Sequence, residues 1–249
     1  RWVQYIISSL AGSIPGCTGV FAIDAAYMAG FVGFGGIISA TVATFGDEAF
    51  VLIGQAALPD SPIKWQMLAV VFVILFVLGV IAGRLADLFA KKTKMVFCRK
   101  CLIEKHEYID TTSTRKIPVK HFLSEHIWGH IIKKHIPNIV LWIFVSLVIV
   151  KALNQSFDME TIITHNKFVL VLAAAIIGIL PLSGPNLIFI TLFAQGQLPF
   201  SIFLTNSIVQ DGHGLLPILG FSVEDAVKIK AFNLLFGLLV GYIFAAFGI

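Results

Sequence analysis

The sequence predicts an all-α, polytopic integral membrane protein with two inverted repeats, whose helices are broken by proline and glycine and followed by hairpins. Three observations predict this fold. The 249 residues are 57% hydrophobic and only 13% charged, whereas soluble domains carry roughly 25% charged residues. Several uncharged stretches are long enough to cross a bilayer. The interruptions of these stretches recur at a constant spacing, as they do in an internal repeat.

The expected membrane spans are the stretches that lack charged residues. They are Trp65–Gly83, Ile136–Val150, Phe168–Gln210 and Ala231–Ile249. Phe168–Gln210 holds 43 residues without Asp, Glu, Lys, Arg or His, a length that suits two helices. The last helix is expected to begin earlier than its span, near Glu224. Trp2–Gly46 contains one charged residue, Asp24.

Two Pro- and Gly-rich breaks interrupt the apolar stretches, at Ser13–Gly19 and at Leu180–Pro185. Proline lacks the backbone donor and glycine is a poor helix former, so both segments are expected to be non-helical. Residue n matches residue n+166 in the pairs Gly12/Gly178, Pro15/Pro181, Gly30/Gly196, Phe34/Phe200, Ser39/Thr205 and Gly46/Gly212. Farther on the offset becomes 158, in Gly79/Gly237 and Gly83/Gly241. Chance similarity of Gly-rich segments is the alternative, and the constant offset argues against it.

The repeat divides the chain into a first transmembrane repeat at residues 1–90, a basic segment at 91–135 and a second repeat at 136–249. The span Ile136–Val150 opens the second repeat and has no counterpart in the first. We therefore expect a further helix upstream of Arg1 in the natural protein. An odd number of crossings per repeat would invert one half relative to the other, a plan that recurs in secondary transporters.

The basic segment contains 11 of the 18 Lys and Arg residues and four acids. Lys and Arg beside membrane spans favour the cytoplasmic side, so residues 91–135 are predicted to be a cytoplasmic loop followed by an amphipathic helix. No nucleic-acid-binding module accompanies these charges, which argues against a nucleic-acid partner. Cys98, Cys101 and His106 resemble half of a zinc site. Reduced thiols and histidines among lipid headgroups are the favoured alternative.

The first break places three candidate substrate-binding residues close together: Cys17, Thr18 and Asp24. If a helix restarts at Cys17, Asp24 lies seven residues later on the same face. An acidic residue at membrane depth is a functional hypothesis by default, because its burial is expensive. The alternative is that Asp24 faces a water-filled vestibule or caps a neighbouring helix. In the second break the corresponding candidates are Ser183 and Asn186.

The end of each repeat's hairpin offers a second group, with Asp47 and Glu48 in the first copy and Asp211 and His213 in the second. Carboxylates and imidazole bind divalent metals and carry protons. These four residues are therefore predicted to bind substrate, as metal ligands. The alternative is that both segments are hydrated loops.

The sequence contains no phosphate-binding loop and no spacing typical of a hydrolase, so we expect neither enzymatic activity nor a cofactor. Paired acids in broken helices leave an intramembrane protease as a minor alternative.

The chain resembles a family of bacterial and archaeal permeases described as ten-helix heavy-metal exporters and often labelled arsenic efflux protein or manganese transporter. The resemblance rests on Gly12–Gly19, the hairpin that follows, Asp47-Glu48 before Ala49–Ile53, the second repeat and the central Cys- and His-bearing loop. The family pattern tends to have Cys after Pro in both repeats. The second position here is Ser183, which disfavours a two-thiolate site and favours oxygen ligands.

The predicted function is secondary-active transport, the export of a metal or metalloid ion by proton- or ion-coupled alternating access. The expected partners are this ion and the lipid bilayer, together with further copies of the chain in a homo-oligomer. The expected location is the cell membrane of a bacterium or archaeon. The alternative is a non-transporting subunit that anchors or senses within a larger complex.

Overall fold

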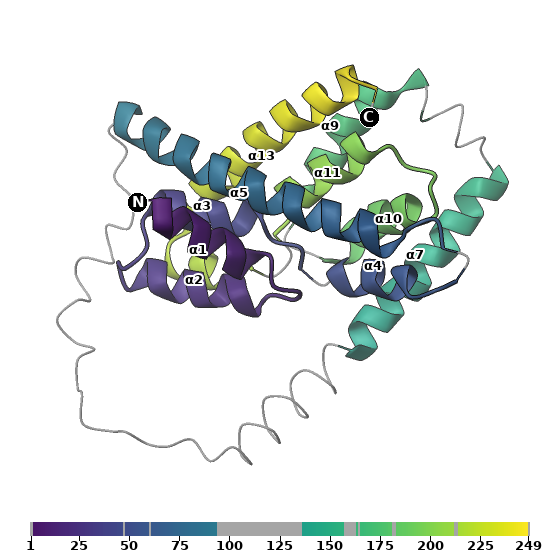
Figure 1. Ribbon diagram of the computed structural model, residues 1–249, viewed down its shortest axis with the longest axis horizontal. Coiled ribbons are helices and arrows are strands. Elements are labelled where there is room, and N and C mark those ends of the chain that lie inside the picture. The colour runs from purple at the N-terminus through teal and green to yellow at the C-terminus, as the bar shows by residue number, and fades with distance from the viewer. Residues whose placement is uncertain are drawn as a thin grey trace, which may run out of the picture.

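The computed structural model describes residues 2–46, 48–59, 61–93, 136–156, 163, 165–180, 183–211 and 214–248. Within these ranges the chain forms helices joined by turns, which confirms the all-α prediction (Figure 1). In chain order the helices are α1 (Trp2–Gly12), α2 (Thr18–Met28), α3 (Phe34–Val42), α4 (Glu48–Ala56), α5 (Trp65–Thr93), α7 (Ile136–Ser156), α9 (Lys167–Gly178), α10 (Ser183–Ala194), α11 (Phe200–Val209), α12 (Leu216–Phe221) and α13 (Val223–Ala246).

The helices follow the repeat that the sequence predicts. Helices α1, α2 and α3 correspond to α9, α10 and α11 at the offset of 166, and α5 corresponds to α13 at 158. Gly30 and Gly196 both end the turn after the second helix with a left-handed backbone, at φ 75° and 72°, which glycine adopts without steric cost. The inverted orientation of one half relative to the other stays a prediction.

Equivalent helix contacts also depend on matched glycines. A Cβ atom on Gly83 of α5 would lie 1.9 Å from Ser39 Oγ of α3, and one on Gly241 of α13 would lie 1.8 Å from Thr205 Oγ1 of α11. Small residues let two helices approach closely where lipid provides no hydrophobic driving force between them. The same four positions therefore bring the long helix of each half onto its third helix.

The two halves interlock through α4 and its matched helix, α12. Helix α4 packs against α10 of the second half (Figure 1). Helix α12 packs against α2 of the first half. Helix α3 also contacts α11 and α13. The buried rings of Phe45 and Phe203, with centroids 6.5 Å apart, join the halves at this boundary. The boundary is where segments far apart in the sequence meet.

Helices α5 and α13 are long and apolar enough to cross a membrane. Of the 18 residues in the most apolar stretch of α5, only 33% are buried inside the protein. Its outer face carries Val70, Val73, Val77, Ile81 and Leu85, all exposed. A contiguous apolar surface of this size suits contact with lipid.

Two details of the predicted helices are wrong. Phe168–Gln210 contains three helices rather than two, because both the second break and the turn at Gly196 divide it. Ser183 and Pro185 lie in the first turn of α10 rather than in the break. Proline is tolerated there because the first backbone N–H groups of a helix have no partner inside it.

Candidate functional site

The ends of the two hairpins meet the first break at the boundary between the halves. Gly16 of the break donates its backbone N–H to the carbonyl of Gly46, at 2.9 Å. A Cβ atom on Gly46 would lie 4.0 Å from Gln210 Nε2, just after α11. Gly46 itself has φ 46°. Three non-helical segments therefore converge at what we call the junction, defined by Gly16, Gly46, Gln210 and Asp211.

A buried ion pair occupies the junction. Lys230 of α13 donates from Nζ to Asp211 Oδ1 and forms a salt bridge with it. The Asp211 side chain is fully buried and that of Lys230 is 14% exposed. The same ammonium donates to the carbonyl oxygens of Gly178 at 3.1 Å and Val209 at 3.2 Å. Lys230 thus joins the end of α9, the end of α11 and the second hairpin end.

Asp24 approaches the junction from the other half. It lies on α2 and is fully buried, and neither carboxyl oxygen has a hydrogen-bond partner among the described residues. Asp24 interacts electrostatically with Asp211. The turn after Asp211 packs on α2, since a Cβ on Gly214 would lie 3.0 Å from Val20 Cγ1. A buried carboxyl group without a hydrogen bond calls for an explanation, and a ligand that binds to this group would provide one.

Buried amide side chains lie on the two helices that carry this ion pair, α11 before Asp211 and α13 after Lys230. Asn206 of α11 donates from Nδ2 to Asn186 Oδ1 and to the Ala174 carbonyl, both at 3.0 Å, and so links α9, α10 and α11. Asn233 of α13 donates from Nδ2 to Thr41 Oγ1 of α3 at 3.1 Å, a bond that joins the halves. The predicted residue Asn186 therefore belongs to a buried polar network.

The other predicted residues are spread more widely. Cys17 is partly buried before the first turn of α2, and Thr18 is exposed. Glu48 is buried at the start of α4. Asp47, His213, the Ser183 side chain and the loop residues Cys98, Cys101 and His106 lie outside the described part of the chain.

The structure does not test the predicted four-ligand set. Within the described ranges, no three His, Cys, Asp or Glu side chains gather closely enough to hold a metal ion. Two of the four predicted ligands, Asp47 and His213, fall outside those ranges. The four-ligand site stays a prediction.

Sequence reasoning missed Lys230, Gln210, Asn206 and Asn233. The signal for Lys230 was available, because it is the last charged residue before the uncharged stretch that ends the chain. A cation near membrane depth is expected to pair with an acid. The amides carried no comparable signal, since Asn and Gln are ordinary members of polar turns.

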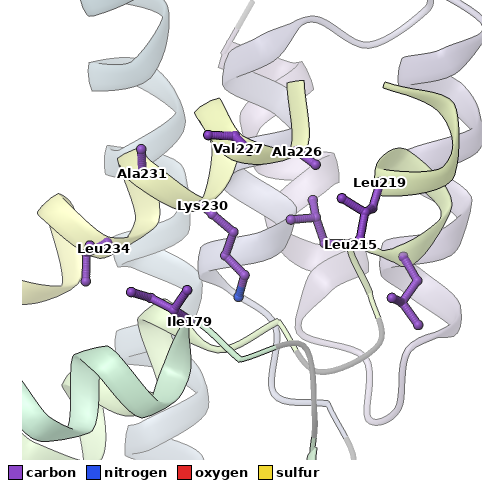
Figure 2. A pocket seen from close by; sticks show the side chains of 9 residues that line it. Ile179, Leu215, Leu219, Ala226, Val227, Lys230, Ala231 and Leu234 are labelled. Carbon is purple, nitrogen blue, oxygen red and sulfur yellow. The ribbon is translucent and has the colours of Figure 1, made fainter. Parts of the chain in front are cut away.

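Beside the junction lies a pocket of about 360 Å³ between α12 and α13. Its lining residues are Ile179, Leu215, Leu216, Leu219, Ala226, Val227, Lys230, Ala231 and Leu234. Figure 2 shows the Lys230 side chain extending from α13 past the apolar lining, with its nitrogen directed away from Val227 and Ala231. The apolar walls do not suit an ion, and Lys230 is the one charged residue among the described residues that line the pocket.

A protein-family profile described as "putative, 10TM heavy-metal exporter", the ArsP_2 family, matches the chain twice, over residues 1–147 and 120–247. Neither the curated proteins nor the solved structures gave a significant match. The two profile matches together cover nearly the whole chain, and the apolar helices and interrupted spans fit a membrane exporter. The chain therefore belongs to the ten-helix heavy-metal exporter family.

Proposed function

We propose that this protein is a secondary-active transporter that exports a metal or metalloid ion across a cell membrane. The observation that carries the proposal is the buried group of Asp24, Asp211 and Lys230 beside the point where the first break meets the ends of both hairpins. Sites of this kind, built from interrupted helices at a repeat interface, hold substrate and coupling ions in transporters.

The transported ion would contact carboxyl oxygens first. Asp24 and Asp211 are the buried acids of the junction, and Asp211 keeps one oxygen without a hydrogen bond among the described residues. Asp47, Glu48 and His213 would add ligands from the two hairpin ends. Cys17, Thr18, Ser183 and Asn186 would line the approach from the two breaks.

The energy would come from an ion gradient, because the sequence contains no nucleotide-binding loop. Acidic groups that exchange between a proton and a cation couple the two flows when the site faces each side in turn. We further propose inverted topology of the halves, which would provide the two alternating orientations. A bacterial or archaeal cell membrane and a homo-oligomeric state complete this proposal.

Flux measurements test the proposal. Purified protein in liposomes should move manganese, zinc or arsenite when a pH gradient is imposed, and Asp24→Asn and Asp211→Asn should each abolish the flux. Lys228→Gln is a matched control, because Lys228 pairs with Glu224 at 2.5 Å on the same helix as Lys230. Asp47→Asn and His213→Ala extend the test to the hairpin ends. Absence of flux for every ion would favour a non-transporting membrane subunit.

A further inference from the structure

The ion pair stands where the first half has two aromatic rings. Asp211 matches Phe45 at the offset of 166, and Lys230 matches Phe72 at 158. Phe45 and Phe72 are in contact, with ring centroids 4.7 Å apart. Both halves therefore join the end of the third helix to the long helix at this place, one with rings and the other with charges.

This comparison removes packing as the reason for the ion pair. Replacing a buried ion pair by apolar groups is often neutral or stabilising, because taking both charges out of water is costly. The cost also applies at membrane depth, where ionisable residues mark ion pathways. Since the first half makes the same connection without charge, the Asp211–Lys230 pair requires an explanation in function.

Among the described residues at the junction, three buried carboxyl oxygens lack a hydrogen bond, against one buried donor, Gln210 Nε2. Asp24 has two carboxyl oxygens and Asp211 one oxygen that accept no hydrogen bond among the described residues, although all three are buried. The Lys230 ammonium pairs with Asp211, and Asp24 interacts with Asp211 but has no cation partner of its own among the described residues. Two interacting buried carboxyl groups with one paired cation are incompletely compensated, so the group is suited to accept another cation.

We propose that the Lys230 ammonium is the tethered occupant of a cation site formed by Asp211 and Asp24, and that an incoming cation displaces it. This inference rests on the proposed transport function and adds a specificity-determining residue to it. After displacement the ammonium keeps the carbonyl oxygens of Gly178 and Val209 as acceptors.

The test compares cation binding by Lys230 variants in detergent micelles, with Mn²⁺ alone and with Zn²⁺ alone as probes. Lys230→Gln should bind at least one probe about tenfold or more tightly than the wild type. In the wild type the ammonium occupies part of the sites and so lowers the apparent affinity for the probe, and this variant has no ammonium there. Adding Asp211→Asn should reverse the gain. Lys228→Gln, on the same helix, should bind like the wild type.

Unchanged or weaker binding by folded Lys230→Gln would overturn the inference. If Lys230→Gln does not fold, Lys230→Arg decides, because a guanidinium holds a carboxylate with two hydrogen bonds and should weaken binding several-fold. Unchanged affinity of Lys230→Arg would then reject the inference. The two proposals also fail separately. Tighter binding by Lys230→Gln without wild-type flux rejects transport alone, and wild-type flux without tighter binding rejects the tethered occupant alone.

Discussion

Near the junction, the two halves share their helix packing and differ in the polarity of matched residues. Besides the ion pair that replaces two phenylalanines, polar residues of the second half stand opposite apolar ones of the first in three matched pairs: Asn186/Val20, Asn206/Ala40 and Asn233/Leu75. Asp24, which matches Ile190, is the reverse case. The comparison indicates that the duplicated scaffold needs none of these polar groups for its packing.

The opposite ends of the long helices reverse this asymmetry. In the first half Arg84 lies 5.5 Å from the centre of the Trp2 ring, and Tyr5 donates to Asp87 at 2.6 Å. The positions that match Trp2 and Arg84 form an aromatic contact in the second half, with ring centroids 6.1 Å apart. Each end of each half therefore has its own set of polar residues. A position in one half can serve as a control for the matched position in the other half.

The largest expected effect concerns the ion pair. Lys230→Phe alone leaves Asp211 buried without its cation and should lower the free energy of unfolding by about 3–5 kcal/mol. Combining it with Asp211→Phe copies the first half and should recover more than half of this loss, leaving about 1–1.5 kcal/mol from overpacking. Denaturant titration in micelles measures both. A double variant as unstable as the single one would show that the halves are not equivalent here.

A smaller effect should separate the two matched glycines. A Cβ on Gly83 would lie 2.3 Å from the backbone carbonyl of Gly35, so Gly83→Ala requires the backbone to shift. A Cβ on Gly241 would meet, within 3.0 Å, only the hydroxyl oxygen of Thr205. We expect both to cost about 1–3 kcal/mol, Gly83→Ala more. Thr205→Ala should rescue Gly241→Ala; failure of that rescue would contradict the contact.

The hydrogen bond at the other end of the first half should contribute less than the ion pair. Tyr5→Phe removes the donor to the Asp87 carboxylate, and we expect a loss of about 1.5 kcal/mol. Asp87 still accepts from the backbone N–H of Gly35 at 2.8 Å, which limits the loss. Tyr242→Phe is the control, expected to change stability by about 0.5 kcal/mol or less. Equal thermal shifts for the two variants would remove the contrast between the halves.

The smallest effect is expected at Asn233. Asn233→Leu copies Leu75 and removes the bond to Thr41, but Thr41 still donates to the Ile38 carbonyl at 3.2 Å. The change also removes a buried amide oxygen that has no hydrogen bond among the described residues. We expect less than about 1 kcal/mol of destabilisation. A loss above about 2 kcal/mol would place Asn233 in a required polar network.

The sequence predicted the scaffold better than the junction. Breaks at proline and glycine and a constant offset are local signals, so the repeated order of helices followed from them, whereas the close contacts at the matched Gly83 and Gly241 emerged only from the structure. The pairing of Asp211 with Lys230 depends on how α13 packs against the end of α11, which no local pattern reports. The expected grouping of Glu48 with Asp211, Asp47 and His213 stays a prediction, because Asp47 and His213 lie outside the described residues.

The central claim is that the charged junction serves transport and that the matched rings serve packing. Flux through liposomes tests it most directly, with Asp211→Phe/Lys230→Phe beside Phe45→Leu/Phe72→Leu at the matched positions. The second-half double variant should lose ion flux, whereas the first-half double variant should retain it, with both proteins folded and equally reconstituted. Equal flux through the two double variants would contradict the account.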